Sequence, residues 1–255
     1  MRRLWALALV GCALANNASF VINIHITHHA GTTLCHVAQA NVNASAKGCF
    51  ANTRYPPQQT ASYLAALAAE QLVFVNWEFR APPRPPLSTF DWETEQVTSI
   101  LVVRDPLERL LADDGYHSRF GPVSDGQNWY RKWTHESWDA YLASEFTDNY
   151  QLRILANGAR DATGLAAAQA LATRFTYIID LACLDYSLEA IAPQLGWTFE
   201  RRPHHRLAPI TERFGNTTRL ALFKQRNEFD ISFYRWAQKK SVVVCDETAT
   251  AHLDY

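Results

Sequence analysis

The sequence predicts an α/β fold built on a central parallel sheet, and three observations support this prediction. Apolar runs of strand length occur at Phe20–Ile26, Leu72–Val75 and Ser99–Val103. Segments with apolar residues at helical spacing separate these runs. The runs are apolar at nearly every position, which is typical of parallel strands covered by helices on both faces.

Length and composition predict one domain. The chain has 255 residues, 48% of them hydrophobic, which is enough to bury one sizeable core. Its formal net charge is −1, so it lacks the basic surface that nucleic-acid partners require. The expected partners therefore do not include nucleic acid.

The N-terminus has the pattern of a targeting segment. Arg2 and Arg3 precede an apolar run, Leu4–Ala15, that ends in a small-x-small cleavage pattern. The run is shorter than the roughly 20 residues that cross a bilayer comfortably. Residues 1–15 are therefore interpreted as a signal peptide, with a short signal anchor as the alternative. Both interpretations place the chain in the secretory pathway.

Sequons and cysteines agree with that compartment. N-x-[ST] triplets begin at Asn17, Asn43 and Asn216. Two cysteine arrangements remain open: a Cys35–Cys49 disulfide with a Cys183–Cys245 disulfide, or buried free thiols at all of these positions.

The first strand leads into a candidate anion site. Phe20–Ile26 breaks at Thr27, and a short loop, His28–Gly31, precedes a helical pattern that Thr32 and Thr33 open. Backbone N–H groups and the positive end of a helix dipole then point at one spot, where Gly31 permits close approach. Phosphate or sulfate is the expected ligand.

The third strand leads into a second basic position. Arg104 follows Ser99–Val103, and Pro106 suits the first turn of a helix. Ligands of α/β folds bind at the carboxyl ends of the strands, and a guanidinium group there matches a phosphate.

The remaining elements are assigned from local patterns. A helix is expected at Ala61–Glu70, and a strand at Thr176–Asp180 follows later in the chain. Asp185 is interpreted as the cap of the next helix. The late helices carry an apolar stripe that consists of Leu222, Phe229, Phe233, Trp236 and Ala237.

Four segments resemble the Golgi carbohydrate sulfotransferases. The loop after the first strand resembles H-I-P-K-T-x-G-T-T, and Arg104–Leu111 resembles R-D-P-x-x-R-x-x-S. Asp148–Ala156 is similar to the N-x-Q-x-R-x-L-A helix of heparan sulfate 6-O-sulfotransferase-like enzymes, and Asn227–Asp230 to their L-N-x-x-D element. The resemblance covers residues 20–240, which leaves residues 241–255 as a C-terminal tail.

This resemblance implies a P-loop-type sheet and a glycan sulfotransferase. The co-substrate would be 3′-phosphoadenylyl sulfate, with no metal, and the location would be the Golgi lumen or membrane, or outside the cell. The N-terminus would anchor the chain to a membrane weakly at most. The implied cofactor-binding residues are His28, Ala30, Gly31, Thr32, Thr33 and Arg104.

Two positions depart from the family pattern. The family's loop lysine is His28 here, and its 3′-phosphate serine is Ala112. His28 is accordingly assigned a catalytic role as a cation at the leaving phosphate, whereas the neighbouring His29 is expected to be dispensable. The departures also favour, as an alternative, a non-catalytic descendant that binds nucleotide or glycan. A P-loop kinase is a weaker alternative, because the lysine of its phosphate loop is missing.

Glu78 is the candidate catalytic base, because family members carry a Glu or His at the end of the second strand. The alternative is a surface carboxylate that pairs with Arg80. His117 is a second candidate for the base. A segment rich in basic residues is expected to be a solvated loop, with anion binding as its alternative: Arg201, Arg202, His204, His205 and Arg206.

Overall fold

The computed structural model describes residues 20–27, 29–42, 49, 60–79, 81–110, 147–201 and 217–244. The predicted signal segment, the sequons and several candidate residues lie outside these ranges. Among the described residues, no helix has the length and apolar character needed to span a membrane.

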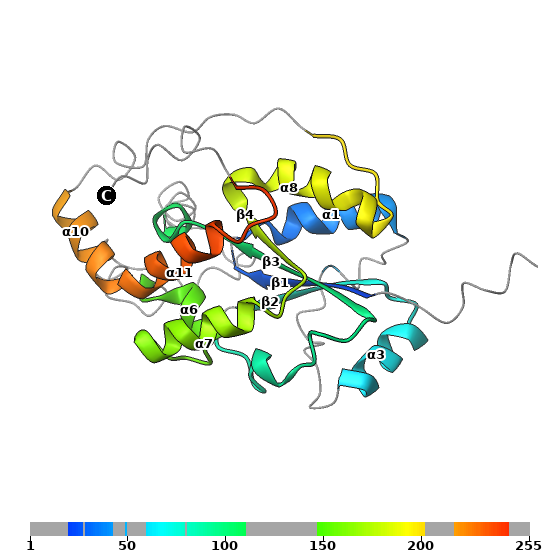
Figure 1. Cartoon of the computed structure of the whole chain (residues 1–255), viewed down its shortest axis with the longest axis horizontal. Helices are drawn as coiled ribbons and strands as arrows, with labels where there is room; N and C mark the ends of the chain where they lie inside the picture. The colour runs from blue at the N-terminus through cyan, green and yellow to red at the C-terminus, as the bar shows by residue number, and fades with distance from the viewer. Residues whose placement is uncertain are drawn as a thin grey trace, which may run out of the picture.

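A parallel sheet forms the centre of the fold, as the sequence predicts. Its strands are β1 (Phe20–Ile26), β2 (Phe74–Phe79), β3 (Val97–Val103) and β4 (Tyr177–Asp180), in the order β2-β1-β3-β4. Every neighbouring pair is parallel (Figure 1). The carboxyl ends of all described strands therefore meet at one edge, and the segments that follow β1 and β3 are neighbours there.

Helices cover both faces of the sheet (Figure 1). On one face, α1 (Gly31–Asn41) and α8 (Leu184–Ile191) share a buried cluster with alternate strand residues. The opposite face carries α3 (Thr60–Ala69), α6 (Tyr150–Leu155), α7 (Ala162–Ala172) and α11 (Glu228–Gln238). The remaining described elements are α10 (Thr217–Arg226) and the short 3-10 helices η1 (Leu87–Thr89), η4 (Leu181–Cys183) and η5 (Ala192–Leu195).

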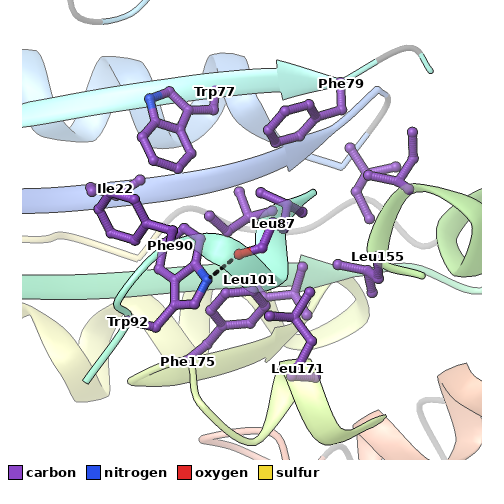
Figure 2. Packing of buried hydrophobic residues seen from close by; sticks show 14 of the residues in the cluster. Ile22, Trp77, Phe79, Leu87, Phe90, Trp92, Leu101, Leu155, Leu171 and Phe175 are labelled. Atoms are coloured by element: carbon purple, nitrogen blue, oxygen red, sulfur yellow. Dashed lines mark hydrogen bonds between the residues drawn. The ribbon is translucent and has the colours of Figure 1, made fainter. Parts of the chain in front are cut away.

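Aromatic side chains fill the face that carries α3 and α7 (Figure 2). The Trp77 ring packs edge-on against Phe90 and Trp92. Each indole N–H has an acceptor, since Trp77 donates to the Tyr63 hydroxyl at 2.7 Å and Trp92 to the Leu87 carbonyl at 2.8 Å. The indole rings of Trp77 and Trp92 are thus buried with their N–H groups satisfied, so they stabilise this face of the sheet without an unpaired donor.

Two local assignments are wrong. The second strand begins at Phe74 and continues through Asn76 and Glu78, instead of covering Leu72–Val75. It continues because these polar side chains pair with the polar side chains of β1 on the same face. Asp185 does not cap a helix: α8 begins at Leu184, and Asp180 instead accepts from the Ala182 N–H at the start of η4.

The cysteines match neither expected arrangement in full. Cys35 and Cys49 are buried free thiols, and the Cys35 thiol donates to the Cys49 carbonyl at 3.5 Å instead of forming the expected disulfide. Cys183 is disulfide-bonded, so the all-thiol alternative is wrong as well. Its partner lies outside the described residues.

The start of the expected C-terminal tail contacts the sheet. Val242 donates its N–H to the Ile178 carbonyl at 2.9 Å, and the Ser241 hydroxyl accepts from the Asp180 N–H at 2.9 Å. These bonds attach the chain after α11 to β4, so the folded unit extends past residue 240.

Candidate functional site

The first turn of α1 has the features of an anion site. The helix begins at Gly31, directly after Ala30 in a left-handed conformation (φ 59°). Its N-cap residue, Ala30, provides no side-chain cap, and no acidic residue lies in the first turn. Thr32 and Thr33 are exposed there. The N-terminal N–H groups and the positive end of the helix dipole are therefore suited to bind an anion, and no acidic residue of the same turn competes for them. Ala30, Gly31, Thr32 and Thr33 are referred to below as the cradle.

Gly31 is required by a neighbouring side chain. A Cβ at this position would overlap the His25 ring, which packs directly against the Gly31 backbone. The Asn76 amide donates to His25 Nδ1 at 3.2 Å, which holds the ring in place. His25 is thereby fixed beneath the cradle.

Gly31→Ala should therefore displace the His25 ring and destabilise the protein by about 1–3 kcal/mol, as overpacking does. Chemical denaturation of both proteins measures this difference. In the His25→Ala background the added methyl group has room, so Gly31→Ala should cost much less there. An equal cost in both backgrounds would contradict the proposed overlap.

A row of polar side chains connects the cradle to Glu78. The parallel register pairs Asn23 with Asn76 and His25 with Glu78, on the face that α1 covers. Glu78 is half-buried, and the Thr27 hydroxyl lies 3.5 Å from its Oε1. Because Thr27 directly follows β1, Glu78 lies at the carboxyl edge beside the cradle loop.

Arg104 occupies the corresponding position after β3. Its guanidinium group lies 3.9 Å from the Glu108 carboxylate, and its side chain is 18% exposed. The next residue, Asp105, accepts from the Leu107 and Glu108 N–H groups at 2.8 and 3.0 Å, so it caps the helical turn at residues 106–110. Burial raises the pKa of Asp105 to about 6 although these two bonds oppose the shift.

Gln151 on α6 bridges the segments that follow β1 and β3. Its Nε2 donates to the Arg104 carbonyl at 2.7 Å, and its Oε1 accepts from the Arg104 N–H at 3.1 Å. The same Oε1 lies 2.8 Å from Nε2 of His29. One buried amide thus fixes the Arg104 backbone relative to the cradle loop.

His29 is consequently not the peripheral residue that the sequence suggests. It is fully buried, and its Nδ1 lies 3.0 Å from the Thr27 carbonyl. Burial lowers its pKa well below the usual value, and the charges of Arg109 and Arg104 add to that shift. These contacts argue against the expectation that its replacement does little, because the change would remove the contact to Gln151.

Hydrogen bonds join the segment Asp148–Ala156, which contains Gln151, to the segment Asn227–Asp230. Asp230 on α11 accepts from the Gln151 and Leu152 N–H groups at 3.1 and 2.6 Å, so a residue of α11 caps α6. Asn149 donates its N–H to the Asn227 side chain at 2.8 Å and accepts from the Asp230 N–H at 2.9 Å. α6 is therefore positioned by contacts from the C-terminal helices.

A buried arginine balances the Asp230 charge. Burial raises the pKa of Asp230 to about 6, while the two backbone N–H donors and the Arg109 charge lower it. The Arg109 guanidinium also lies 3.6 Å from the Tyr150 ring centroid, which is a cation–π geometry. The positive charge of Arg109 thus opposes the effect of burial on the Asp230 carboxylate.

Several sequence-predicted candidates lie outside the described residues: His28, Arg80, Ala112, His117, Arg202, His204, His205 and Arg206. Arg201 is described, and its guanidinium lies over the Tyr186 ring at 4.4 Å from the centroid. Within the described ranges, no group of three or more His, Cys, Asp or Glu side chains could hold a metal ion.

The sequence interpretation missed His29, Gln151 and the packing role of His25. A signal existed for His25, because a histidine in an apolar strand of a covered sheet needs a polar partner. Gln151 belongs to the segment Asp148–Ala156 that resembles a family motif, but that resemblance assigns it no role. Comparison with protein-family models and with curated proteins found no match to this chain.

Proposed function

We propose that this chain is a sulfotransferase that transfers a sulfuryl group from 3′-phosphoadenylyl sulfate to a hydroxyl of a glycan. The proposal includes a P-loop-type sheet and action in the Golgi lumen or at the Golgi membrane. A glycan is the proposed acceptor, and no metal takes part.

The observation that carries the proposal is the bridge between two anion-binding elements. The N-terminus of α1 follows β1, an arginine follows the neighbouring β3, and the Gln151 amide joins the His29 ring to the Arg104 backbone. A nucleotide with phosphates at two places requires two anion sites at a fixed spacing. The cradle and Arg104 supply them at the edge where α/β folds bind ligands.

Each residue then has a role in transfer. The cradle N–H groups and the Thr32 and Thr33 hydroxyls bind the phosphosulfate end of the donor, and Arg104 binds its 3′-phosphate. The donor supplies the sulfuryl group. Glu78 accepts the proton of the attacking sugar hydroxyl, and the polar row beneath it holds it beside the cradle. His28 neutralises charge at the leaving phosphate.

Transfer of radiolabel from the donor to a mixed glycan panel tests this function. Label on a glycan, without divalent metal, is the expected result. Binding of adenosine 3′,5′-bisphosphate without any transfer would favour the non-catalytic descendant, to which His28 and Ala112 point. Transfer that requires Mg²⁺ and ATP would favour the kinase.

Arg104→Ala should remove most of the preference for adenosine 3′,5′-bisphosphate over AMP. A hydrogen bond between charged groups contributes about 1.5–3 kcal/mol, which is roughly 10- to 150-fold in affinity. Calorimetric titration with both nucleotides measures the preference, and the stabilisation of the melting temperature provides a second readout.

The matched control is Arg160→Ala, since Arg160 is half-exposed and pairs with Asp148 at the surface. It should leave both affinities unchanged. Equal binding of AMP and the bisphosphate by the unmutated protein would contradict the assignment of Arg104.

A further inference from the structure

Both ring nitrogens of His29 face oxygen atoms. Nδ1 lies 3.0 Å from the Thr27 carbonyl, and Nε2 lies 2.8 Å from Gln151 Oε1. The orientation of the Gln151 amide is fixed, because its other contacts are the Arg104 carbonyl, which only accepts, and the Arg104 N–H, which only donates. Neither partner of the ring can donate, so only a doubly protonated imidazole satisfies both contacts.

The surroundings oppose that charge in the absence of a ligand. The ring is fully buried, and two guanidinium groups lie near it, Arg104 after β3 and Arg109 in the following helical turn. Arg104 is partly balanced by Glu108, and Arg109 by Asp230. Burial and the two arginines lower the pKa of His29 well below its usual value. At neutral pH the ring therefore carries one N–H group, although both of its nitrogens face an oxygen acceptor.

An anion at the cradle changes this balance. His29 directly precedes Ala30 in the cradle, and a phosphate at Arg104 would offset one of the two positive charges that disfavour the imidazolium. A neutral ring leaves one short contact between a lone pair and an oxygen, whereas a charged ring makes both hydrogen bonds.

We infer that His29 takes up a second proton when a ligand bearing phosphate or sulfate groups occupies the cradle, and that the charged ring then clamps the segments after β1 and β3 at the spacing the ligand needs. His29 and Gln151 are thus positioning residues. The inference rests on the proposed function insofar as the ligand is a donor nucleotide.

The sign of the pH dependence follows from linkage. The pKa of His29 is higher with ligand than without it, so affinity rises as pH falls through the ligand-bound pKa. The slope is at most about tenfold per pH unit for one proton, and affinity becomes constant below the ligand-free pKa.

Calorimetric titration with adenosine 3′,5′-bisphosphate, in two buffers of different ionisation enthalpy between pH 5.5 and 8, counts the protons taken up. Because the ligand's own phosphates titrate in this range, the informative quantity is the difference between unmutated protein and His29→Gln. On binding the ligand, His29→Gln should take up fewer protons than the unmutated protein, by up to one, and its affinity should depend less on pH. The reason is that the glutamine amide can donate a hydrogen bond but does not titrate.

The matched control is His36→Gln, because His36 is an exposed histidine of α1. The His36→Gln variant should take up as many protons on ligand binding as the unmutated protein. Nitrogen NMR shifts of the histidine rings in the unmutated protein, with and without ligand, give a readout that needs no variant.

The outcomes separate this inference from the proposed function. Bisphosphate binding with equal proton uptake in the unmutated protein and a folded His29→Gln variant overturns the inference alone. Pyrophosphate is titrated in parallel: linked uptake with pyrophosphate, but no binding of the bisphosphate, supports the inference and overturns the function. A ring whose nitrogen shifts do not change on ligand binding overturns the inference.

Discussion

Glu78→Gln should lower the turnover of sulfate transfer by about 10²- to 10⁴-fold while the affinity for the donor stays nearly unchanged. The amide keeps the shape of the side chain and can still contact the Thr27 hydroxyl, but it cannot accept a proton from the sugar. Steady-state kinetics with a glycan acceptor, together with titration of adenosine 3′,5′-bisphosphate, separate the two effects.

Glu95→Gln is the control for this change, because Glu95 is an exposed carboxylate that precedes β3, at the opposite edge of the sheet. Its turnover should match that of the unmutated protein. A Glu78→Gln enzyme within a few-fold of the unmutated rate would assign Glu78 a structural role and make His117→Ala the next variant to measure.

Asp230→Ala should destabilise the protein by about 3–5 kcal/mol, the range seen when one partner of a buried charged network is removed. The change leaves two N–H groups at the start of α6 without their acceptor and removes a buried negative charge that interacts with Arg109. Denaturant unfolding measures the loss. Asp230→Asn keeps one acceptor oxygen, so its stability should lie between that of the unmutated protein and that of Asp230→Ala.

Glu228→Ala is the matched control, since Glu228 is an exposed acidic residue in the same first turn of α11. A change there should remain within about 0.5 kcal/mol. If the two alanine variants lose equal stability, the helix dipole of α11, and not the cap on α6, accounts for the effect of Asp230.

The elements of the sheet could be predicted because their apolar patterns are local. Phe20–Ile26 has the predicted bounds, and the third strand gains only Val97 and Thr98. The second strand was misplaced because Asn76 and Glu78 end its apolar run, although polar partners on β1 continue the strand. Pairing between strands far apart in the chain leaves no local signal.

The candidate site was predictable in its parts but not in its connections. The cradle and Arg104 follow from the rule that parallel strands end at one edge. His29 was misjudged because its partner Gln151 is 122 residues away, and adjacent histidines in a polar loop give no indication of which one is buried.

The cap that Asp230 places on α6 sets an order of events during synthesis. Leu152 and Asp230 are 78 residues apart, so a nascent chain carries both anion-binding segments long before the residue that holds their bridge in place. A contact over such a separation forms late, because it closes a long loop. The proposed nucleotide binding should therefore begin only after α11 has left the ribosome, however early β1 and the cradle emerge.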